Sequence, residues 1–467
     1  MLVYESMKKG FITIIFSLIF IYFLSFSLIS LHRFWQYESF YYDMGIYDQS
    51  IWQVSRFQLP FTDQLGAYGK IIFADHFVPS LFLLSPFYWF TDKTEMIFIV
   101  QSLAVALSGV IAFLLARKNI KNNLVVFGLI FSYLGYVGLQ NALITDFHDT
   151  TVATLVLMFI FWTIFMKKWK YYFPALIILL GFKESMAGLG LGLGLYLFLR
   201  KERFPKIAAI TIFISLFWGM VTTKILIPYF SGGTYTYSPI YPKNILSWIL
   251  NLFLPIIKTR TILVSLATFA FIPVFYIPLL PAILEHFLER FVLQPAATRW
   301  DLGMHYNALL SPLFFVSSLE LYIILIRQKK ENLVKFMSVI SILMTLYIHQ
   351  FLQHGPINLA FNKDFYRHTG DFKFLDNLTR AVRTDKLVMA QNNLATRFTH
   401  GKVMLLSNNY AERKPYAVVI DFRSGQNPNN FFPLSMEETN TLIVTLTHDP
   451  QYNLEKKGHD QYLFFRK

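Results

Sequence analysis

The chain has 467 residues, of which 55% are hydrophobic and only 15% are charged, and phenylalanine alone occurs 49 times. Soluble domains carry roughly 25% charged residues, so this composition excludes an ordinary soluble protein and favours a membrane protein. The net charge of +14 would suit nucleic-acid binding, but the basic residues lie at the ends of apolar runs, so no nucleic-acid partner is expected. The absence of cysteine excludes disulfides and thiolate metal sites.

Apolar runs predict about eleven transmembrane helices in a membrane domain of residues 1–352. The first run, 11–31, is long enough to cross a hydrocarbon core of about 30 Å. No small-residue cleavage site follows it, so we expect a retained helix rather than a signal peptide. The other predicted spans are 94–116, 123–141, 150–166, 170–182, 185–199, 206–228, 244–257, 261–282, 305–326 and 333–352. The run 76–90 is short and holds two prolines, which favours an interfacial or re-entrant segment in a long first outer loop, 32–93.

The distribution of Lys and Arg predicts the orientation in the membrane. With the N-terminus in the cytoplasm, the short cytoplasmic segments hold 18 basic residues and only three acidic ones, and such an excess is typical of the cytoplasmic side. These basic residues are Lys8, Lys9, Arg117, Lys118, Lys121, Lys167, Lys168, Lys170, Arg200, Lys201, Arg203, Lys206, Lys258, Arg260, Arg327, Lys329, Lys330 and Lys335. We therefore expect a multi-pass plasma-membrane protein whose C-terminal part is extracytoplasmic.

The stretch 353–467 has a different character, with no run long enough to span a membrane. Short β-rich segments alternate with polar ones, and a helical pattern at 374–382 precedes the first of them. The predicted strands are 386–390, 402–406, 416–422, 441–446 and 462–466. This pattern predicts a small soluble α/β domain.

Alternating glycines at 188–196 look like a phosphate-binding loop. They lie inside an apolar span, however, where small residues let neighbouring helices approach closely. We therefore predict a packing role for them.

Ionisable residues are costly near a membrane core, so those at the outer face are the candidates for function. One cluster lies in 41–53, where Asp43 is placed to cap a helix over 44–56, and Asp48 and Gln49 of that helix would face water. Capping is a simple alternative to a catalytic role for Asp43. The other clusters are Asp75 and His76; Asp146, His148 and Asp149; and the pair Lys183 and Glu184, which suits a structural ion pair as well as a functional one.

A later stretch, 297–312, brings Arg299, His305 and Tyr306 to the outer end of a predicted span. Cations together with acids at one face suggest a phosphate-bearing substrate and a carboxylate that accepts a proton. Carboxylate and imidazole ligands also suit Mg or Mn, so Asp146, His148 and Asp149 are candidate ligands of a divalent cation, although their spacing specifies no metal.

The order of these motifs resembles the prokaryotic membrane-protein family called domain of unknown function 2079. The resemblance covers most of the chain in one order. It rests on Asp43, Gly45, Gln49 and Trp52; on His76, Phe77 and Pro79; on Asp146, Phe147 and His148; on Lys183 and Glu184; and on His305, Tyr306 and Pro312. The C-terminal domain departs from the pattern, because a His is expected before Arg397 and this sequence has His400 after it.

This family is similar in turn to the membrane glycosyltransferases of the GT-C fold. The resemblance implies inverting transfer of a sugar from a polyprenyl-phosphate donor, held in the membrane lipid, to an acceptor on the extracytoplasmic face. It implies Asp43 and Asp146 as catalytic residues. The substrate-binding residues would be Gln49, His76, Lys183, Glu184, Arg299, His305 and Tyr306.

Two other functions fit the same residues. A transporter or flippase of a lipid-linked or phosphorylated substrate could use the Lys183–Glu184 pair and the glycine-rich helix for gating, but the inverted repeats common in transporters are not seen. A non-enzymatic scaffold could simply present the C-terminal domain. The sugar, the acceptor and the oligomeric state are left open by the sequence.

The cysteine-free chain allows a direct test of the topology. Single Lys118→Cys, Lys168→Cys and Lys329→Cys substitutions are expected to escape an impermeant thiol reagent in intact cells and to react after permeabilisation, because all three positions are predicted to be cytoplasmic. A substitution in 353–467 should react in intact cells. Labelling of Lys168→Cys from outside would invert the predicted map.

Overall fold

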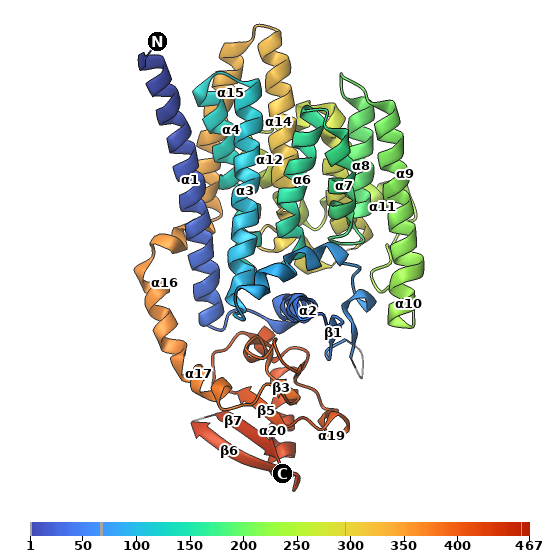
Figure 1. Cartoon of the computed structure of the whole chain (residues 1–467), viewed down its shortest axis with the longest axis vertical. Coiled ribbons are helices and arrows are strands. Elements are labelled where there is room, and N and C mark those ends of the chain that lie inside the picture. The colour runs from blue at the N-terminus through green and yellow to red at the C-terminus, as the bar shows by residue number, and fades with distance from the viewer. Residues whose placement is uncertain (1, 66–68, 295, 459) are drawn as a thin grey trace.

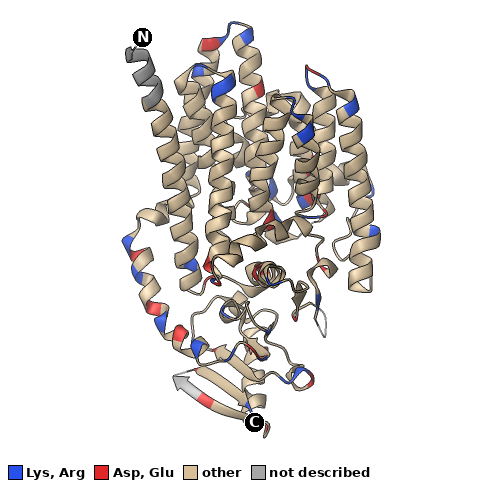
Figure 2. Ribbon diagram, in the orientation of Figure 1, with Lys and Arg blue, Asp and Glu red and all other residues tan. Residues whose placement is uncertain are grey.

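The computed structural model describes residues 2–65, 69–294, 296–458 and 460–467, and the side chains of 2–9 and 456–458 lie outside the described part, including those of Lys8 and Lys9. The helices of the membrane domain stand side by side as a bundle, and a small sheet-containing domain lies beyond one end of it (Figure 1). The N-terminus lies at the opposite end of the bundle. Many Lys and Arg residues occupy the turns at that opposite end (Figure 2), as the predicted orientation requires.

Within the described residues, five helical stretches are long and apolar enough to cross a membrane, and two bent helix pairs raise this number to seven. Two of the five are Gly10–Trp35, which belongs to α1 (Leu2–Trp35), and α3 (Glu95–Asn119). The third, Pro205–Ser231, joins α9 (Pro205–Val221), η4 (Thr222–Leu226) and α10 (Ile227–Ser231). The last two are His305–Arg327, which contains η9 (His305–Asn307) and α14 (Leu310–Arg327), and Glu331–Leu352, which contains α15 (Glu331–Tyr347) and η10 (Ile348–Leu352). The bent pairs are α4 (Asn123–Gly135) with α5 (Val137–Ile144), and α11 (Ile245–Phe253) with α12 (Ile256–Thr268). Three shorter apolar helices are α6 (Asp149–Phe165), α7 (Trp169–Leu180) and α8 (Met186–Leu199).

The predicted count of eleven spans is not confirmed: the predicted spans 150–166, 170–182 and 185–199 correspond to the three shorter helices α6, α7 and α8, and a further difference lies between residues 244 and 288. The runs 244–257 and 261–282 were expected to be separate spans, but α11 and α12 form one pair bent by 69° around Pro255. After α12 the chain continues as the short η5 (Ile272–Phe275), η6 (Ile277–Leu279) and α13 (Leu280–Leu288). Prolines at the start of these pieces break the helix, because proline lacks the N–H donor and clashes with the preceding turn.

The first outer loop lies across one end of the bundle. It contains the π-helical turn η1 (Tyr41–Gly45), α2 (Ile46–Ser55), the two-stranded β1 (Phe61–Thr62) and β2 (Lys70–Ile71), η2 (Ile72–Ala74) and η3 (Pro79–Trp89). The run 76–90 therefore forms a short 3-10 helix, with Pro86 inside it, rather than a span. In Figure 1 α2 lies between the bundle and the C-terminal domain.

The glycines of α8 pack against neighbouring helices, as predicted. A Cβ atom on Gly192 would lie 2.6 Å from Ala282 Cα of α13, and one on Gly188 would overlap the side chain of Glu285. The bare backbone of α8 thus allows α13 to approach it, which places Glu285 directly beside α8.

The C-terminal domain is reached through η11 (Pro356–Phe361), α16 (Lys363–His368), η12 (Thr369–Phe372) and α17 (Lys373–Arg380), which run along the outside of the molecule (Figure 1). Its sheet has the order β4-β3-β5-β7-β6, in which β3 pairs parallel with β4 and β5, and the other neighbours are antiparallel. The strands are β3 (Val388–Ala390), β4 (Val403–Leu405), β5 (Ala417–Asp421), β6 (Tyr452–Gly458) and β7 (Gln461–Arg466), and the short helices are α18 (Asn392–Ala395), α19 (Tyr410–Arg413) and η13 (Pro428–Phe431).

One predicted strand in this domain is wrong, because 441–446 belongs to the helix α20 (Met436–His448). A capping box between Ser435 and Glu438 starts this helix. Its buried residues Thr439, Leu442, Ile443 and Leu446 then follow helical spacing. The β-branched composition of 441–446 favoured a strand, but the cap and the 3.6-residue period decide the structure.

Gly192 provides a test of the helix packing. We expect Gly192→Ala to lower the free energy of unfolding by about 1–3 kcal/mol, because the added methyl group meets backbone atoms of α13 that cannot rotate away. Gly370→Ala is the matched control, since a Cβ atom at Gly370 has nothing within 4 Å. Thermal denaturation in detergent measures both, and equal melting temperatures would contradict the close approach of α8 and α13.

Candidate active site

Asp43 lies in the π-helical turn η1, at the end of the bundle that faces the C-terminal domain. A π-helical turn is wider than an α-helical one and is often found at functional sites. Asp43 does not cap α2: the residue before α2 is Gly45, and no side chain caps either η1 or α2. The capping explanation for Asp43 is therefore wrong.

Asp43 faces a cavity of about 260 Å³, named here the site cavity. Its lining residues come from the first loop, the start of α6, the α7–α8 turn, the stretch after η4 and the segment 296–306. They are Tyr42, Asp43, Ile46, Tyr47, Ile72, Asp75, His76, His148, Lys183, Tyr237, Ala296, Thr298, Arg299, His305 and Tyr306. Eight residues singled out from the sequence thus meet here: Asp43, Asp75, His76, His148, Lys183, Arg299, His305 and Tyr306.

The Asp43 carboxylate has no hydrogen-bond donor among the described residues. The His148 ring lies beside it, with Nε2 4.0 Å from Asp43 Oδ1, and the Asp43 side chain keeps 39% of its surface exposed. Burial raises the pKa of Asp43 to about 6, against the opposing effect of Lys183. Asp43 is thus an available carboxylate whose pKa suits it to take up a proton near neutral pH.

The floor of the cavity is formed by two stacked imidazoles. The rings of His148 and His305 are 3.3 Å apart at their centroids and inclined by 15°. Burial, with the positive charge of Lys183, lowers the pKa of His148 to about 3, so this ring is neutral. In the described part of the chain, the Nδ1 atoms of both rings and Asp149 Oδ2 are buried without a hydrogen-bond partner. Buried polar atoms are normally satisfied, so these three are exceptions among the described residues.

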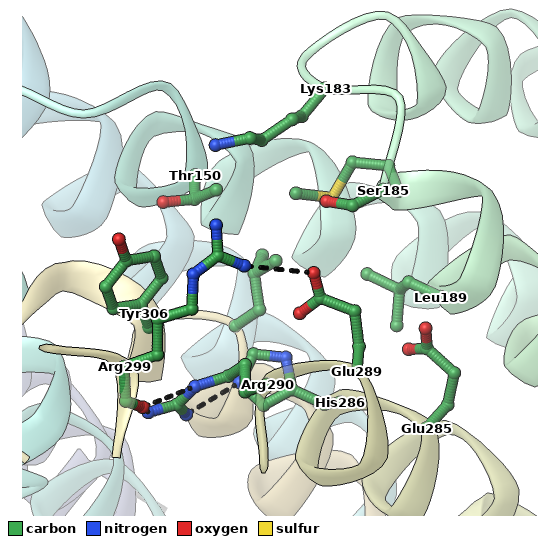
Figure 3. A pocket seen from close by; sticks show the side chains of 12 residues that line it. Thr150, Lys183, Ser185, Leu189, Glu285, His286, Glu289, Arg290, Arg299 and Tyr306 are labelled. Atoms are coloured by element: carbon green, nitrogen blue, oxygen red, sulfur yellow. Dashed lines mark hydrogen bonds and ion pairs between the residues drawn. The ribbon is translucent and has the colours of Figure 1, made fainter. Parts of the chain in front are cut away.

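Two cations face the same space from the other side. Lys183, in the turn between α7 and α8, has no hydrogen-bond or ion-pair partner among the residues that the structure describes. Burial opposes its charge, but Asp149 and Glu184 outweigh that effect and raise the pKa of Lys183, so it stays protonated. Arg299 at the end of η8 (Ala297–Arg299) lies 3.4 Å from Glu289, and both its side chain and that of Lys183 extend into one space (Figure 3).

Glu184, unlike its neighbour Lys183, has hydrogen-bond partners on both carboxylate oxygens. Its Oε1 accepts hydrogen bonds from His76 Nδ1 at 2.8 Å and from Tyr235 Oη at 2.7 Å, and its Oε2 accepts one from Phe77 N at 3.1 Å. Burial acts to raise the pKa of Glu184, but the contacts with His76 and Lys183 outweigh it and lower the value to about 2. Glu184 therefore fixes the start of the re-entrant segment and does not line the site cavity.

Asp146 also lies outside the lining of the site cavity. Its Oδ2 accepts a hydrogen bond from Phe40 N at 3.0 Å, at the residue that precedes η1, and its own backbone is left-handed with φ 60°. Burial and the nearby charge of Asp43 raise the pKa of Asp146 to about 7. Asp146 is thus placed to hold the segment that carries Asp43, and its catalytic role stays a prediction.

The predicted metal ligands do not converge. Asp146 is turned to Phe40, and Asp149 Oδ1 accepts a hydrogen bond from Thr150 N. No group of three or more His, Asp or Glu side chains in the described ranges is arranged to hold a metal ion. The divalent cation stays a prediction without geometric support.

Gln49 and Asp48 have structural partners rather than a place in the cavity. Gln49 is buried between Tyr41 and Gly401, which give it two hydrogen bonds. Asp48 was expected to face water, but it is 0% exposed. Its partners Thr94 and Thr399 are 46 and 351 residues away in the sequence. The burial of Asp48 therefore cannot be recognised from the residues around it in the sequence.

Several residues at the site were missed from the sequence. Tyr237 stacks on His76, with ring centroids 4.5 Å apart, and donates a hydrogen bond to Asp75. A second, smaller cavity shares Lys183, Arg299 and Tyr306 with the site cavity and is also lined by Glu285, His286, Glu289 and Arg290 (Figure 3). Arg290 is a cation that the sequence already places near the outer face, whereas Glu285, His286 and Glu289 were missed. Four ionisable residues within 285–290, beside an apolar run, were the signal that would have found them.

A groove of about 510 Å³ adjoins these cavities, named here the α8–α9 groove. It shares Ser185, Glu285 and Glu289 with the second cavity and Tyr237 with the site cavity. Its walls include Gly188, Leu191, Leu216, Gly219 and Met220, and Leu216 and Met220 are exposed on the outside of the bundle. The site therefore borders a groove of mixed lining, in which Glu184, Lys224, Glu285 and Glu289 accompany apolar side chains that are partly exposed on the outside of the bundle.

The fold and the site together define a polytopic membrane protein with a GT-C-like fold. The structure is similar to the crystal structure of ArnT from Cupriavidus metallidurans bound to undecaprenyl phosphate, with a TM-score of 0.53, 10% sequence identity and coverage of 98% of both chains. ArnT is a glycosyltransferase of the GT-C fold. At this identity the likeness establishes the fold alone.

The chain belongs to the family described as predicted membrane protein (DUF2079), whose model matches residues 33–451. This confirms the resemblance carried by the motifs. No match to the chain was found among curated proteins.

Substitutions of Asp146 test whether this residue only holds the segment that carries Asp43 or also takes part in catalysis. We expect Asp146→Asn to keep its stability, because asparagine also accepts the Phe40 hydrogen bond and tolerates a left-handed backbone. Asp146→Ala should lose about 1–3 kcal/mol in free energy of unfolding, since the acceptor is removed. Thermal denaturation in detergent compares the two. An Asp146→Asn protein that is stable but inactive would give the charge of Asp146 a direct catalytic role.

Proposed function

We propose that this protein is an inverting glycosyltransferase that moves a sugar from a polyprenyl-phosphate donor to an acceptor at the extracytoplasmic face. One observation carries the proposal: among the described residues, Asp43, a carboxylate without a hydrogen-bond donor, and Lys183, an ammonium without an ion-pair partner, line the same cavity of a GT-C-like fold. Unpaired charges at a membrane surface are costly, and a substrate that needs both charges accounts for them.

The chemistry needs one base and at least one cation. The acceptor hydroxyl attacks the anomeric carbon of the sugar and gives its proton to the Asp43 carboxylate. The bond between the anomeric carbon and the phosphate oxygen breaks, and the lipid phosphate leaves with the electron pair. Lys183 and Arg299 stabilise the charge that gathers on this phosphate. Transfer with inversion needs only this single base, whereas an inverting hydrolase uses two carboxylates.

The sugar and the lipid chain of the donor would bind in two different cavities, with Lys183 and Arg299 near the phosphate that joins them. The sugar would lie in the site cavity, where His148, His305, Tyr237 and Asp75 offer aromatic faces and polar atoms. The polyprenyl chain would lie along the apolar wall of the α8–α9 groove, where Leu216 and Met220 are exposed on the outside of the bundle. Lys183 and Arg299 stand between the two, where the phosphate of such a donor would be.

Asp43→Asn tests the proposal. We expect kcat for transfer of a labelled sugar from a polyprenyl-phosphate donor, in reconstituted membranes, to fall by about 10²–10⁴-fold with an unchanged melting temperature, because asparagine cannot take the proton. The wild-type rate should fall as the pH drops below about 6, since the carboxylate is then protonated, and this dependence should be lost in the variant.

The matched control is Glu38→Gln, which removes the same charge from the same loop. Glu38 pairs with Arg33 at the surface, and such pairs contribute little, so activity should stay within about twofold. Full activity of Asp43→Asn would remove Asp43 as the base. Movement of the lipid across the membrane without sugar transfer would point to a flippase instead.

A further inference from the structure

The C-terminal domain supplies hydrogen bonds near the site from the stretch 392–401, named here the docking segment, and Phe432 of the same domain adds a ring contact with Tyr42 at 4.6 Å between centroids. The docking segment consists of α18 and the turn that follows. Asn392 Oδ1 accepts a hydrogen bond at 3.0 Å from the backbone N of Tyr42, the residue next to Asp43. Asn392 Nδ2 donates to Asn429 O at 2.9 Å, which fixes the orientation of this amide. The C-terminal domain thus holds the η1 backbone one residue before Asp43.

The docking segment also holds the other side of Asp43. Gln49 Nε2 donates a hydrogen bond to Gly401 O at 2.9 Å, and Gln49 Oε1 accepts one from Tyr41 Oη at 2.5 Å. The Tyr41 ring lies on Gly45, where a Cβ atom would overlap it. Asp43, Gly45 and Gln49 of the first-loop motif therefore act together. Gly45 leaves room for the Tyr41 ring, and Gln49 connects that ring to the docking segment by hydrogen bonds.

Asp48 is the contact shared by both domains. Its carboxylate is fully buried and accepts hydrogen bonds from Tyr88 Oη and from Thr94 Oγ1 at 3.1 Å, both in the membrane domain. From the docking segment it accepts a hydrogen bond from Thr399 Oγ1, and His400 Nε2 lies 3.2 Å away as an ion-pair contact without hydrogen-bond geometry. A buried carboxylate needs such donors, so α2 keeps this burial only while the docking segment is in place.

We propose that the docking segment positions Asp43 for transfer, and that Asp48, Asn392 and Thr399 are positioning residues of the active site. The proposal rests on the proposed function. Among the described residues, no side chain of the C-terminal domain lines the site cavity, so the domain acts through η1 and α2 and not on the substrate.

The two halves of the site should respond differently when docking is weakened. Lys183 and Arg299 lie on the α7–α8 turn and on η8, and neither contacts the docking segment. Donor binding should therefore persist, whereas a shift of Asp43 by about 1 Å can cost about 10²-fold in rate. Weakened docking is expected to lower kcat and to leave KM for the donor unchanged.

The test uses the full-length protein in reconstituted membranes with Thr399→Val and Asn392→Ala. Each is expected to lose about 10- to 100-fold in kcat with donor KM within about twofold, and Thr399→Ser, which keeps the hydroxyl, should recover the activity. Thr441→Val on the exposed face of α20 is the matched control and should behave as the wild type. Wild-type kcat in both docking variants, or an equal loss in donor binding, would overturn the proposal.

A second measurement does not depend on transfer. In this cysteine-free chain, Asp43→Cys can be labelled with an impermeant thiol reagent, and its labelling rate reports how η1 is held. Adding Asn392→Ala or Thr399→Val should raise that rate several-fold, and adding Thr441→Val should not. Unchanged rates would overturn the positioning role. If the wild type transfers no sugar but the rates rise, the proposed function fails and the docking stands.

Discussion

A carboxylate buried near a membrane needs hydrogen-bond donors, and this requirement holds the site together. Three carboxylates meet it with protein groups: Asp146 with Phe40 N, Glu184 with His76, Phe77 N and Tyr235, and Asp48 with residues of both domains. Each joins segments far apart in sequence, and together they fix the first loop, the re-entrant segment and the C-terminal domain. Within the described part of the chain only Asp43 of these four has no donor. The three satisfied carboxylates build the site that leaves the fourth available.

Much of the fold followed from the sequence, because hydrophobic runs and the positions of Lys and Arg are local signals. The membrane-protein class, the lack of a long apolar helix in the described run 76–90 and most strands of the C-terminal domain were predictable in this way. Predictions failed where several local signals compete, as in 441–446, where the capping box at Ser435 outweighs β-branched composition. They also failed where prolines divide an apolar stretch, as after Thr268.

For the candidate site, the sequence predicted which residues meet but not what each of them does. Ionisable residues at the outer ends of apolar runs pointed to eight side chains that line one cavity, because a membrane confines such residues to its surface. Their individual roles were not visible. Asp48 and Asp43 carry the same charge in the same loop, and tertiary contacts of Asp48 with Tyr88, Thr94 and Thr399 make one structural and leave the other available.

The adjacency of Lys183 and Glu184 limits how this protein can change. The two residues are adjacent in the sequence, yet the Glu184 carboxylate is hydrogen-bonded to neighbouring segments and the Lys183 ammonium lines the cavity. An insertion or deletion in the turn between α7 and α8 would turn the ammonium away or release the re-entrant segment, so the length of this turn is fixed. Diversification toward other donors is then confined to the cavity walls and to the α8–α9 groove, where side chains can vary without altering the spacing of the charges.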